Sequence, residues 1–480
     1  MKKLLLLFGV LLMLTSCEDT DIQNPNSPTS AAVLGAPTDY QAIVDGAYYS
    51  WWTALHKYSP YFTLNVAADF ATSSWGNFGM RDVGTISAPY GLGNHSAINN
   101  STTYGSRSFI TTPYYGLSQA IVSVNTIFNE IIVNGTSVIE NDGTDNTNHV
   151  LATGYFARGL SYGYLSLLYD KSFVFIEGGE AAGLTADALK PYTEVSMQAI
   201  SDLEQAISIA NGLGSMEVNG FNGLTLGKAE FIQLANSYIA KFTAQLARTS
   251  SENATSDWAK VLTTANAGIT FDLAPIGDGG TVWWHGNYYF GNPGWIRLDQ
   301  KVVNMVDSSQ PFPFPASGSY TIPTTMPDAR FGPGKDFRPQ ATIPFRSDRG
   351  IYFYSYYTIS RYEAYRTNLT LPMVTFPEVE NDLLKAEALI RTSGDLNMAA
   401  TLINKTRVTR GGLSPAQGSD SDLMDKLFYE RYLNAYEGPG SPFFDRRRTD
   451  DLGPKQFKDL PIPALELQTI GAEVYTTGGI

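Results

Sequence analysis

The sequence contains little cysteine, histidine or charge, and each shortage argues against a class of protein. One cysteine among 480 residues excludes an intramolecular disulfide, and four scattered histidines argue against a multi-histidine metal site. Only 16% of the residues are charged, and 46 acidic side chains outnumber 33 basic ones, which is unsuited to binding nucleic-acid phosphates. No Walker A, H-E-x-x-H or C-x-x-C motif occurs. We therefore expect no cofactor, no bound metal and no nucleic-acid partner.

The N-terminus has the parts of a secretory signal. Lys2 and Lys3 precede an apolar run over 4–14, which is too short for a membrane-spanning helix of about 20 residues. The only cysteine, Cys17, follows Leu-Thr-Ser, and this tetrapeptide resembles the lipobox at which bacterial lipoproteins are cleaved and acylated. An ordinary signal peptide with an incidental cysteine is the alternative. We predict a signal peptide over 1–16 and a lipidated Cys17 that anchors the protein to the outer membrane.

A polar segment follows the cysteine. Glu18, Asp19 and Asp21 come first, and 24–29 contains prolines and no apolar periodicity. Such a composition is typical of a flexible tether. The acidic start resembles the export signal that sends some Bacteroidetes lipoproteins to the outer face of the outer membrane, and a plain solvated tether is the alternative. We predict a tether over 17–37 and a single domain over 38–480.

Helical periodicity recurs along the rest of the chain, with apolar residues three and four positions apart. Helices are predicted around 38–55, 113–133, 156–167, 191–210, 231–246, 256–268, 379–390, 396–403 and 420–436. Between them, 69–112 and 270–350 are long loop-rich insertions, dense in Gly, Pro, Asn and aromatic residues. The sequence thus predicts a mostly α scaffold of tetratricopeptide-like helix pairs, with long loop insertions and little β-structure.

One motif is typical of hydrolases. Residues 159–163 read Gly-Leu-Ser-Tyr-Gly and match the G-x-S-x-G nucleophile elbow, which requires a strand before the serine, and an acid and a histidine after it. Here the motif lies inside a predicted helix. Glycines four positions apart on a helix more simply permit close helix packing, and we favour that interpretation.

A loop near residue 145 is rich in oxygen-bearing side chains. Asp142, Asp145, Asn146 and Asn148 could ligate calcium, but their spacing fits no EF-hand. A solvated loop is the better interpretation, and we predict no metal there.

The segment over 283–295 is rich in aromatic side chains, which Gly, Asn and Pro residues interrupt. Its candidate ligand-binding residues are Trp283, Trp284, Asn287, Tyr288, Tyr289 and Trp295. Flat aromatic faces can stack on the C–H faces of sugars, and the Asn287 amide can bind hydroxyl groups. The alternative, of equal weight, is a loop that folds its aromatic residues inward as a small core.

An earlier loop combines aromatic and polar side chains. It contains Trp75 together with Asp69, Asn77 and Arg81. That mixture suits a polar ligand that requires both stacking and bidentate hydrogen bonds. Anchoring of a buried loop is the competing explanation.

A third aromatic segment lies over 352–365. Its aromatic side chains alternate in part, which predicts a packed strand. We assign it to the core.

Several short segments follow one another in a characteristic order. They are Tyr155–Gly159 with Tyr169, Leu384–Ala388 with Gly394 and Asp395, Ala400–Arg407, Tyr429–Gly438, Phe443–Arg447, and Leu460–Pro463 ahead of Glu466. Together with the lipobox and the helix pairs, they resemble the SusD/RagB family of Bacteroidetes nutrient-uptake lipoproteins. The resemblance covers most of the mature chain and is strongest over 375–470. Asn434 departs from it by replacing an acidic residue, and the acids and arginines of this region are predicted to form salt bridges in the scaffold.

The resemblance implies a non-catalytic glycan-binding lipoprotein. It would capture oligosaccharides at the cell surface and deliver them to a SusC-like TonB-dependent outer-membrane channel. The helices would face the channel and the loops would bind the ligand. No ligand-binding residue transfers by motif, so the residues proposed above rest on loop chemistry alone.

Other functions stay open from the sequence. A surface glycoside hydrolase requires two carboxylates about 5–9 Å apart, which Asp69 and Asp82 could supply. A pure partner scaffold would use the aromatic residues only for packing, and a nutrient-binding protein could take a peptide instead of a sugar. An acidic or sulfated ligand would meet Arg81 or Arg297.

Overall fold

The computed structural model describes residues 34–73, 75, 77–84, 98–179, 184–292, 294–315, 321–340, 355–434, 436–453 and 456–475. The predicted signal peptide, Cys17 and most of the predicted tether lie outside these residues. The lipid anchor and the domain boundaries therefore stay predictions.

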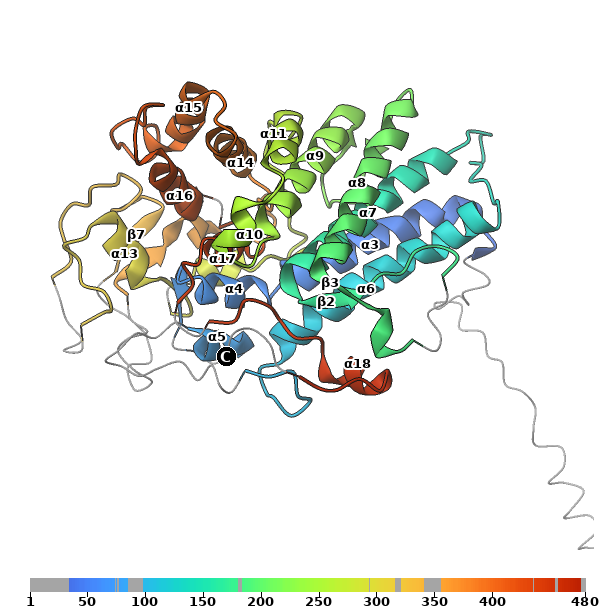
Figure 1. Ribbon diagram of the computed structural model, residues 1–480, viewed down its shortest axis with the longest axis horizontal. Coiled ribbons are helices and arrows are strands. Elements are labelled where there is room, and N and C mark those ends of the chain that lie inside the picture. The colour runs from blue at the N-terminus through green and yellow to red at the C-terminus, as the bar shows by residue number, and fades with distance from the viewer. Residues whose placement is uncertain are drawn as a thin grey trace, which may run out of the picture.

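Helices dominate the described chain (Figure 1). The α-helices are α3 (Tyr40–Leu55), α4 (Tyr61–Ala67), α5 (Met80–Val83), α6 (Ser108–Phe128), α7 (Thr147–Leu168), α8 (Tyr192–Gly212), α9 (Lys228–Gln245), α10 (Ser250–Ala254), α11 (Trp258–Asn266), α12 (Asn287–Phe290), α13 (Gln300–Val306), α14 (Glu378–Arg391), α15 (Leu396–Arg407), α16 (Leu423–Asn434), α17 (Ser441–Arg448) and α18 (Ala464–Thr469). Shorter helical turns are η1 (Pro37–Asp39), η2 (Asn77–Gly79), η5 (Ala186–Ala188) and η8 (Ser360–Arg366), and the π-helix η4 (Asn129–Val133) continues α6. Every helix predicted from periodicity is present, although several begin or end elsewhere.

The described strands are short and form antiparallel pairs. The pairs are β1 (Ala71–Thr72) with β6 (Arg297–Leu298), β2 (Lys171–Phe173) with β3 (Leu189–Pro191), β4 (Glu217–Val218) with β5 (Leu226–Gly227), and β7 (Phe337–Pro339) with β8 (Tyr357–Ile359). The prediction of a mostly α fold with little β-structure is confirmed. The strand predicted over 352–365 is wrong in extent, because only β8 is extended and η8 follows it at once; 352–354 lie outside the described residues.

Helices that follow one another along the chain pack side by side. In Figure 1, α3, α6, α7, α8 and α9 form one slanted stack, and α11, α14, α15 and α16 continue from it. A tight turn joins α14 to α15, where the Asp395 carboxylate accepts hydrogen bonds from the backbone N–H groups of Asn397 and Met398. The chain thus has the helix–turn–helix organisation that its periodicity predicts.

The segment Ser108–Val133 is the one described helix long and apolar enough to cross a membrane, judged by length and composition alone. In this structure it packs between α3 and α7, and its apolar side chains such as Phe109, Leu117 and Val124 are fully buried. Only 39% of its most apolar stretch is buried, and Val122, Ile132 and Val133 are 52%, 43% and 56% exposed.

The glycines of the hydrolase-like motif allow α7 to pack closely. A Cβ atom on Gly163 would lie 2.0 Å from the Phe242 ring of α9, and one on Gly159 would lie 2.8 Å from Leu203 of α8. Ser161 lies on the same helix, where its Oγ donates 2.9 Å to the Ala157 carbonyl. The helix-packing interpretation is confirmed, because the serine is neither on a strand-to-helix turn nor exposed.

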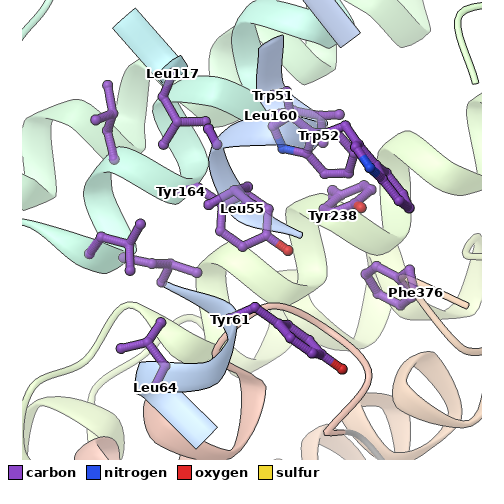
Figure 2. Close-up of a cluster of buried hydrophobic side chains, with 14 of the residues drawn as sticks. Trp51, Trp52, Leu55, Tyr61, Leu64, Leu117, Leu160, Tyr164, Tyr238 and Phe376 are labelled. Carbon is purple, nitrogen blue, oxygen red and sulfur yellow. The ribbon is translucent and has the colours of Figure 1, made fainter. Parts of the chain in front are cut away.

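An aromatic core joins the scaffold to the loop-rich half. Figure 2 shows Trp51 and Trp52 of α3 close to Tyr164 of α7 and Tyr238 of α9. Tyr238 packs edge to face on Phe376, with ring centroids 5.0 Å apart. Large rings can thus fill the space between these elements with few side chains.

Buried ion pairs hold the C-terminal helices to the rest. Arg448 of α17 binds Glu387 of α14 through two contacts of 2.6 Å, and both side chains are fully buried. The other buried pairs are Arg158–Asp202, Lys241–Glu380, Arg330–Glu430, Arg431–Asp445 and Arg446–Asp69. The prediction that these acids and arginines form salt bridges in the scaffold is confirmed.

Replacing Glu387 by Gln should lower the free energy of unfolding at pH 7 by about 2–3 kcal/mol, because the buried Arg448 charge loses its bidentate partner and keeps only the Asp445 carboxylate, at 2.9 Å. Burial raises the pKa of Glu387, but the opposite effect of Arg448, Arg431 and Arg391 is larger and lowers the pKa to about 2. The carboxylate is therefore charged at neutral pH. Urea denaturation measures the change. The matched control is Glu204→Gln, which removes the more exposed Lys260–Glu204 pair and should cost less than about 1 kcal/mol. Equal losses of unfolding free energy in the two variants would contradict a stabilising role for the buried Arg448–Glu387 pair.

Candidate functional site

The structure brings the two predicted ligand loops together, although more than two hundred residues separate them. β1 pairs with β6, so that Ala71 faces Leu298 and Thr72 faces Arg297. Beyond this pair, Ser73 Oγ donates 2.8 Å to the Trp295 carbonyl. Trp75 Nε1 donates 2.8 Å to the Gly294 carbonyl. These contacts fix the indole of Trp75 beside that of Trp295.

Six partly exposed rings form what we call the aromatic surface: Tyr58, Trp75, Phe78, Tyr288, Tyr289 and Trp295. Trp75 lies nearly parallel to Trp295, with centroids 6.1 Å apart and planes inclined by 21°. Trp295 contacts Tyr289 at 4.5 Å, and Tyr289 contacts Tyr288 at 5.3 Å. Tyr58 and Phe78 stack at 5.4 Å and also contact Tyr289. The rings are therefore continuous from one loop to the other.

Trp283 and Trp284 lie beneath this surface. Trp283 is 8% exposed and packs on Trp52 of α3, with centroids 4.8 Å apart. Trp284 is 9% exposed and contacts Tyr58 at 5.0 Å and Tyr289 at 5.4 Å. The prediction that these two indoles are stacking platforms is corrected here: they support the exposed rings, as in the small-core alternative.

Three polar residues named from the sequence are also interior. The Asn287 Oδ1 atom accepts a 2.8 Å hydrogen bond from the Tyr61 hydroxyl, and the residue is fully buried. Asp69 is 3% exposed, and its carboxylate binds Arg446 at 2.7 Å. Arg297 is fully buried beside β1. Their predicted contacts with a ligand are wrong for this structure, because these side chains are buried and do not reach the surface.

Asn77 and Arg81 are exposed at the edge of the same loop. Next to Asn77, Phe78 has a left-handed backbone with φ of +56°, which is strained for an aromatic residue. Thr63 Oγ1 donates 2.5 Å to the Phe78 carbonyl and helps to hold this conformation. The loop tip thus presents one partly exposed ring and two exposed hydrogen-bonding side chains.

Tyr58 and Phe78 were not singled out from the sequence. Phe78 lies within the predicted loop, where its aromatic character was the available signal. Tyr58 follows α3 and precedes a proline-containing turn, so nothing in the local pattern points to a ligand. Only the folded arrangement places Tyr58 over Trp284.

The start of the tryptophan-rich loop is organised by one carboxylate. Asp278 accepts hydrogen bonds from the backbone N–H groups of Gly280, Thr281, Val282 and Trp283, at 2.7–3.1 Å. Burial raises the pKa of Asp278, but these four donors outweigh it and the pKa lies below its usual value. The loop is therefore locked at its base, which pre-organises the rings that follow.

Few groups on the aromatic surface carry charge at neutral pH. Burial raises the pKa of Tyr289, and the neighbouring Tyr58 and Tyr288 raise it further, so the phenol stays neutral. Asp82 accepts a 2.6 Å hydrogen bond from the Tyr104 hydroxyl. The surface and its rim offer stacking faces, hydroxyl groups, the Asn77 amide and two cations, Arg81 and Lys57, whose Nζ lies 6.0 Å from the centre of the Tyr58 ring. Because the six rings themselves are uncharged, the surface is suited to a polar ligand of low charge.

His285, just below this surface, gives the fold a measurable dependence on pH. Burial lowers the pKa of His285 to about 3, whereas an unfolded imidazole has its usual value of 6.5. Between these values the unfolded chain binds a proton that the folded ring does not, so stability falls as the pH falls from 6.5. Replacing His285 by Phe should reduce the slope of unfolding free energy against pH by about 1.4 kcal/mol per unit between pH 6 and 4.

Urea denaturation across this range gives the two slopes. Carboxylates contribute to both proteins alike, so the difference reports the imidazole. Parallel curves for His285→Phe and the unchanged protein would contradict a neutral buried His285.

No protein-family model matches the sequence, and no curated protein matches it. Solved structures do match the fold. A SusD superfamily protein from Parabacteroides distasonis is 14% identical, with a TM-score of 0.60 over 90% of this chain and 97% of the other. A SusD homolog from Bacteroides thetaiotaomicron is 14% identical, with a TM-score of 0.62 over 90% and 96%. A SusD-like carbohydrate binding protein from Bacteroides vulgatus is 14% identical, with a TM-score of 0.52 over 86% and 83%.

Proposed function

On the basis of its SusD-like fold, we propose that this chain is a non-catalytic, cell-surface glycan-binding lipoprotein. It captures oligosaccharides on the aromatic surface and delivers them to a partner TonB-dependent outer-membrane transporter. The observation that carries the proposal is the continuous set of rings contributed by two distant loops.

The chemistry of that surface suits a sugar. A pyranose ring presents C–H groups on its faces and hydroxyl groups at its rim. Trp75 and Trp295 offer flat faces for the first, while Asn77 and Arg81 offer donors and acceptors for the second. A ligand held in this way requires no reactive group on the protein.

Two further observations support the proposal. One structural neighbour is described as a carbohydrate binding protein, at a likeness that covers most of both chains. The lipobox and acidic tether favour an anchor at Cys17 and an outward-facing position on the outer membrane. A surface location would place the aromatic rings where soluble glycan fragments first meet the cell.

The two carboxylates proposed for a glycoside hydrolase are both engaged by other side chains. Asp69 is buried in its pair with Arg446, and Asp82 accepts a hydrogen bond from Tyr104. A glycosidase requires two carboxylates that flank the scissile bond, one of them able to donate a proton. Asp69 and Asp82 cannot supply that arrangement in this structure.

Replacing Trp295 or Trp75 by Ala should weaken oligosaccharide binding about ten- to a hundredfold, since each change removes a stacking face worth about 1.5–3 kcal/mol. Affinity electrophoresis and calorimetry with maltoheptaose, cellohexaose, xylohexaose and mannohexaose measure the loss. Tyr115→Ala is the matched control, because Tyr115 is a 38% exposed aromatic residue of α6 outside the aromatic surface. Unchanged affinity in both tryptophan variants would favour a pure packing role for these rings.

Incubation of the purified protein with plant and host polysaccharides should release no new reducing ends. The proposal also predicts that binding falls little when the salt concentration is raised, because few charges take part. New reducing ends that appear with this protein, and not with contaminating enzymes, would show that it is a hydrolase and contradict the non-catalytic role. A steep loss of binding at high salt would instead indicate an acidic or sulfated ligand that meets Arg81.

A further inference from the structure

A cavity lies between α13, α16 and the end of α17. Its volume is about 390 Å³, within the range of small-molecule sites. It shares no lining residue with the aromatic surface. The function proposed above makes no use of it.

One face of α16 forms the aromatic wall of this cavity. Asp425, Phe428, Tyr429 and Tyr432 follow one another at helical spacings of three, one and three residues, and all four line it. Phe428, Tyr429 and Tyr432 are only half-buried, whereas Leu427, Glu430, Arg431 and Leu433 on the other side of the helix are buried. Met305 of α13 lines the cavity as well.

The three rings of this wall are held in place. A guanidinium lies over each ring: Arg448 over Phe428 at 5.3 Å, Arg330 over Tyr429 at 5.7 Å and Arg446 over Tyr432 at 5.7 Å. The Tyr432 hydroxyl donates 2.6 Å to the Ala68 carbonyl. A wall fixed in this way can bind a flat ligand face with little loss of side-chain freedom.

Arg431 lines the cavity, and an ion pair fixes its guanidinium. Its Nε and Nη2 atoms bind the Asp445 carboxylate at 2.8 and 3.0 Å, which directs Nη1 to the opposite edge of the planar guanidinium. Among the described residues, none accepts a hydrogen bond from Nη1, although Arg431 is 1% exposed. Nη1 has less than 1 Å² of accessible surface, so a ligand in the cavity does not reach it.

The charges around the cavity balance. Lys301, Arg431 and Arg446 face three carboxylates, those of Asp425, Asp445 and Asp451. A strongly anionic or cationic ligand would meet as much repulsion as attraction. A neutral ligand with several hydroxyl groups can donate to the carboxylates and accept from the cations.

We propose that this cavity is a second saccharide site, in which one neutral pyranose ring stacks on the aromatic wall of α16 and meets the charged side chains at the cavity rim with its hydroxyl groups. The sugar class rests on the proposed function. With two sites on one chain, a long glycan is held at two points, and the second contact forms at a high effective concentration.

The test combines crystals with titrations. Crystals of the protein are soaked in each of maltoheptaose, cellohexaose, xylohexaose and mannohexaose, and calorimetry of the same sugars gives the number of sites. Phe428→Ala removes part of the wall. Thr449→Tyr leaves the three rings in place and fills the cavity with a larger side chain. It therefore tests the site even if Phe428→Ala folds poorly. Thermal unfolding checks both variants, and Tyr115→Ala is the control.

We expect a pyranose ring in the cavity against Phe428, Tyr429 and Tyr432, and two sites per chain in solution. Phe428→Ala and Thr449→Tyr should each weaken one site at least about tenfold, whereas Trp295→Ala should weaken the other. An empty cavity in all four soaks, or binding at crystal concentration only, overturns the inference. Sugar on the aromatic surface alone then leaves the proposed function intact, and sugar in the cavity alone supports the inference while contradicting the role of the aromatic surface.

Discussion

The ion pair between Asp69 and Arg446 is the contact on which the arrangement of scaffold and loops depends. Asp69 follows α4 with a left-handed backbone, φ of +52°, and leads directly into β1. Arg446 of α17 binds both the Asp69 carboxylate and the Ala68 carbonyl, and Tyr432 donates to the same carbonyl. Because β1 then pairs with β6, the Asp69–Arg446 ion pair sets the position of both loops. Such a buried pair gives little net stability, but it fixes a unique connection between elements distant in sequence.

Much of the helical scaffold can be predicted from the sequence, because periodicity is a local signal. The stripe of Phe156, Leu160 and Tyr164 marks α7, and the same helix carries the glycines that allow close packing. The acids and arginines of the C-terminal third are also recognisable as ion-pair partners. Hydrophobic spacing thus indicates which face of a helix is buried. It does not indicate which other helix covers that face.

The candidate site could be predicted only in part. In an aromatic loop rich in Gly and Asn, apolar and polar residues do not alternate as they do in a strand with one buried face. Nothing local therefore distinguishes Trp295, which is partly exposed, from Trp283, which is buried. Asp69 and Asn77 are both polar residues of the same predicted loop, and nothing near them in the sequence indicates which one is buried. The Asp69 side chain is held inside by Arg446, which is far along the chain. Tyr58 joins the surface only because Trp284 lies beneath it. Contacts between distant segments decide each of these outcomes, and no window of sequence contains them.

The pairing of β1 with β6 is only two residues long, yet each loop leaves it and returns to helices of the scaffold. Beyond this strand pair, Trp283, Trp284, His285 and Asn287 belong to the buried core, whereas Trp75, Asn77 and Trp295 are partly or fully exposed. The exposed side chains can therefore be exchanged one by one while the strand pair, the buried loop residues and the helices stay as they are. Such a design allows ligand preference to diversify rapidly among descendants of one ancestor without a new architecture.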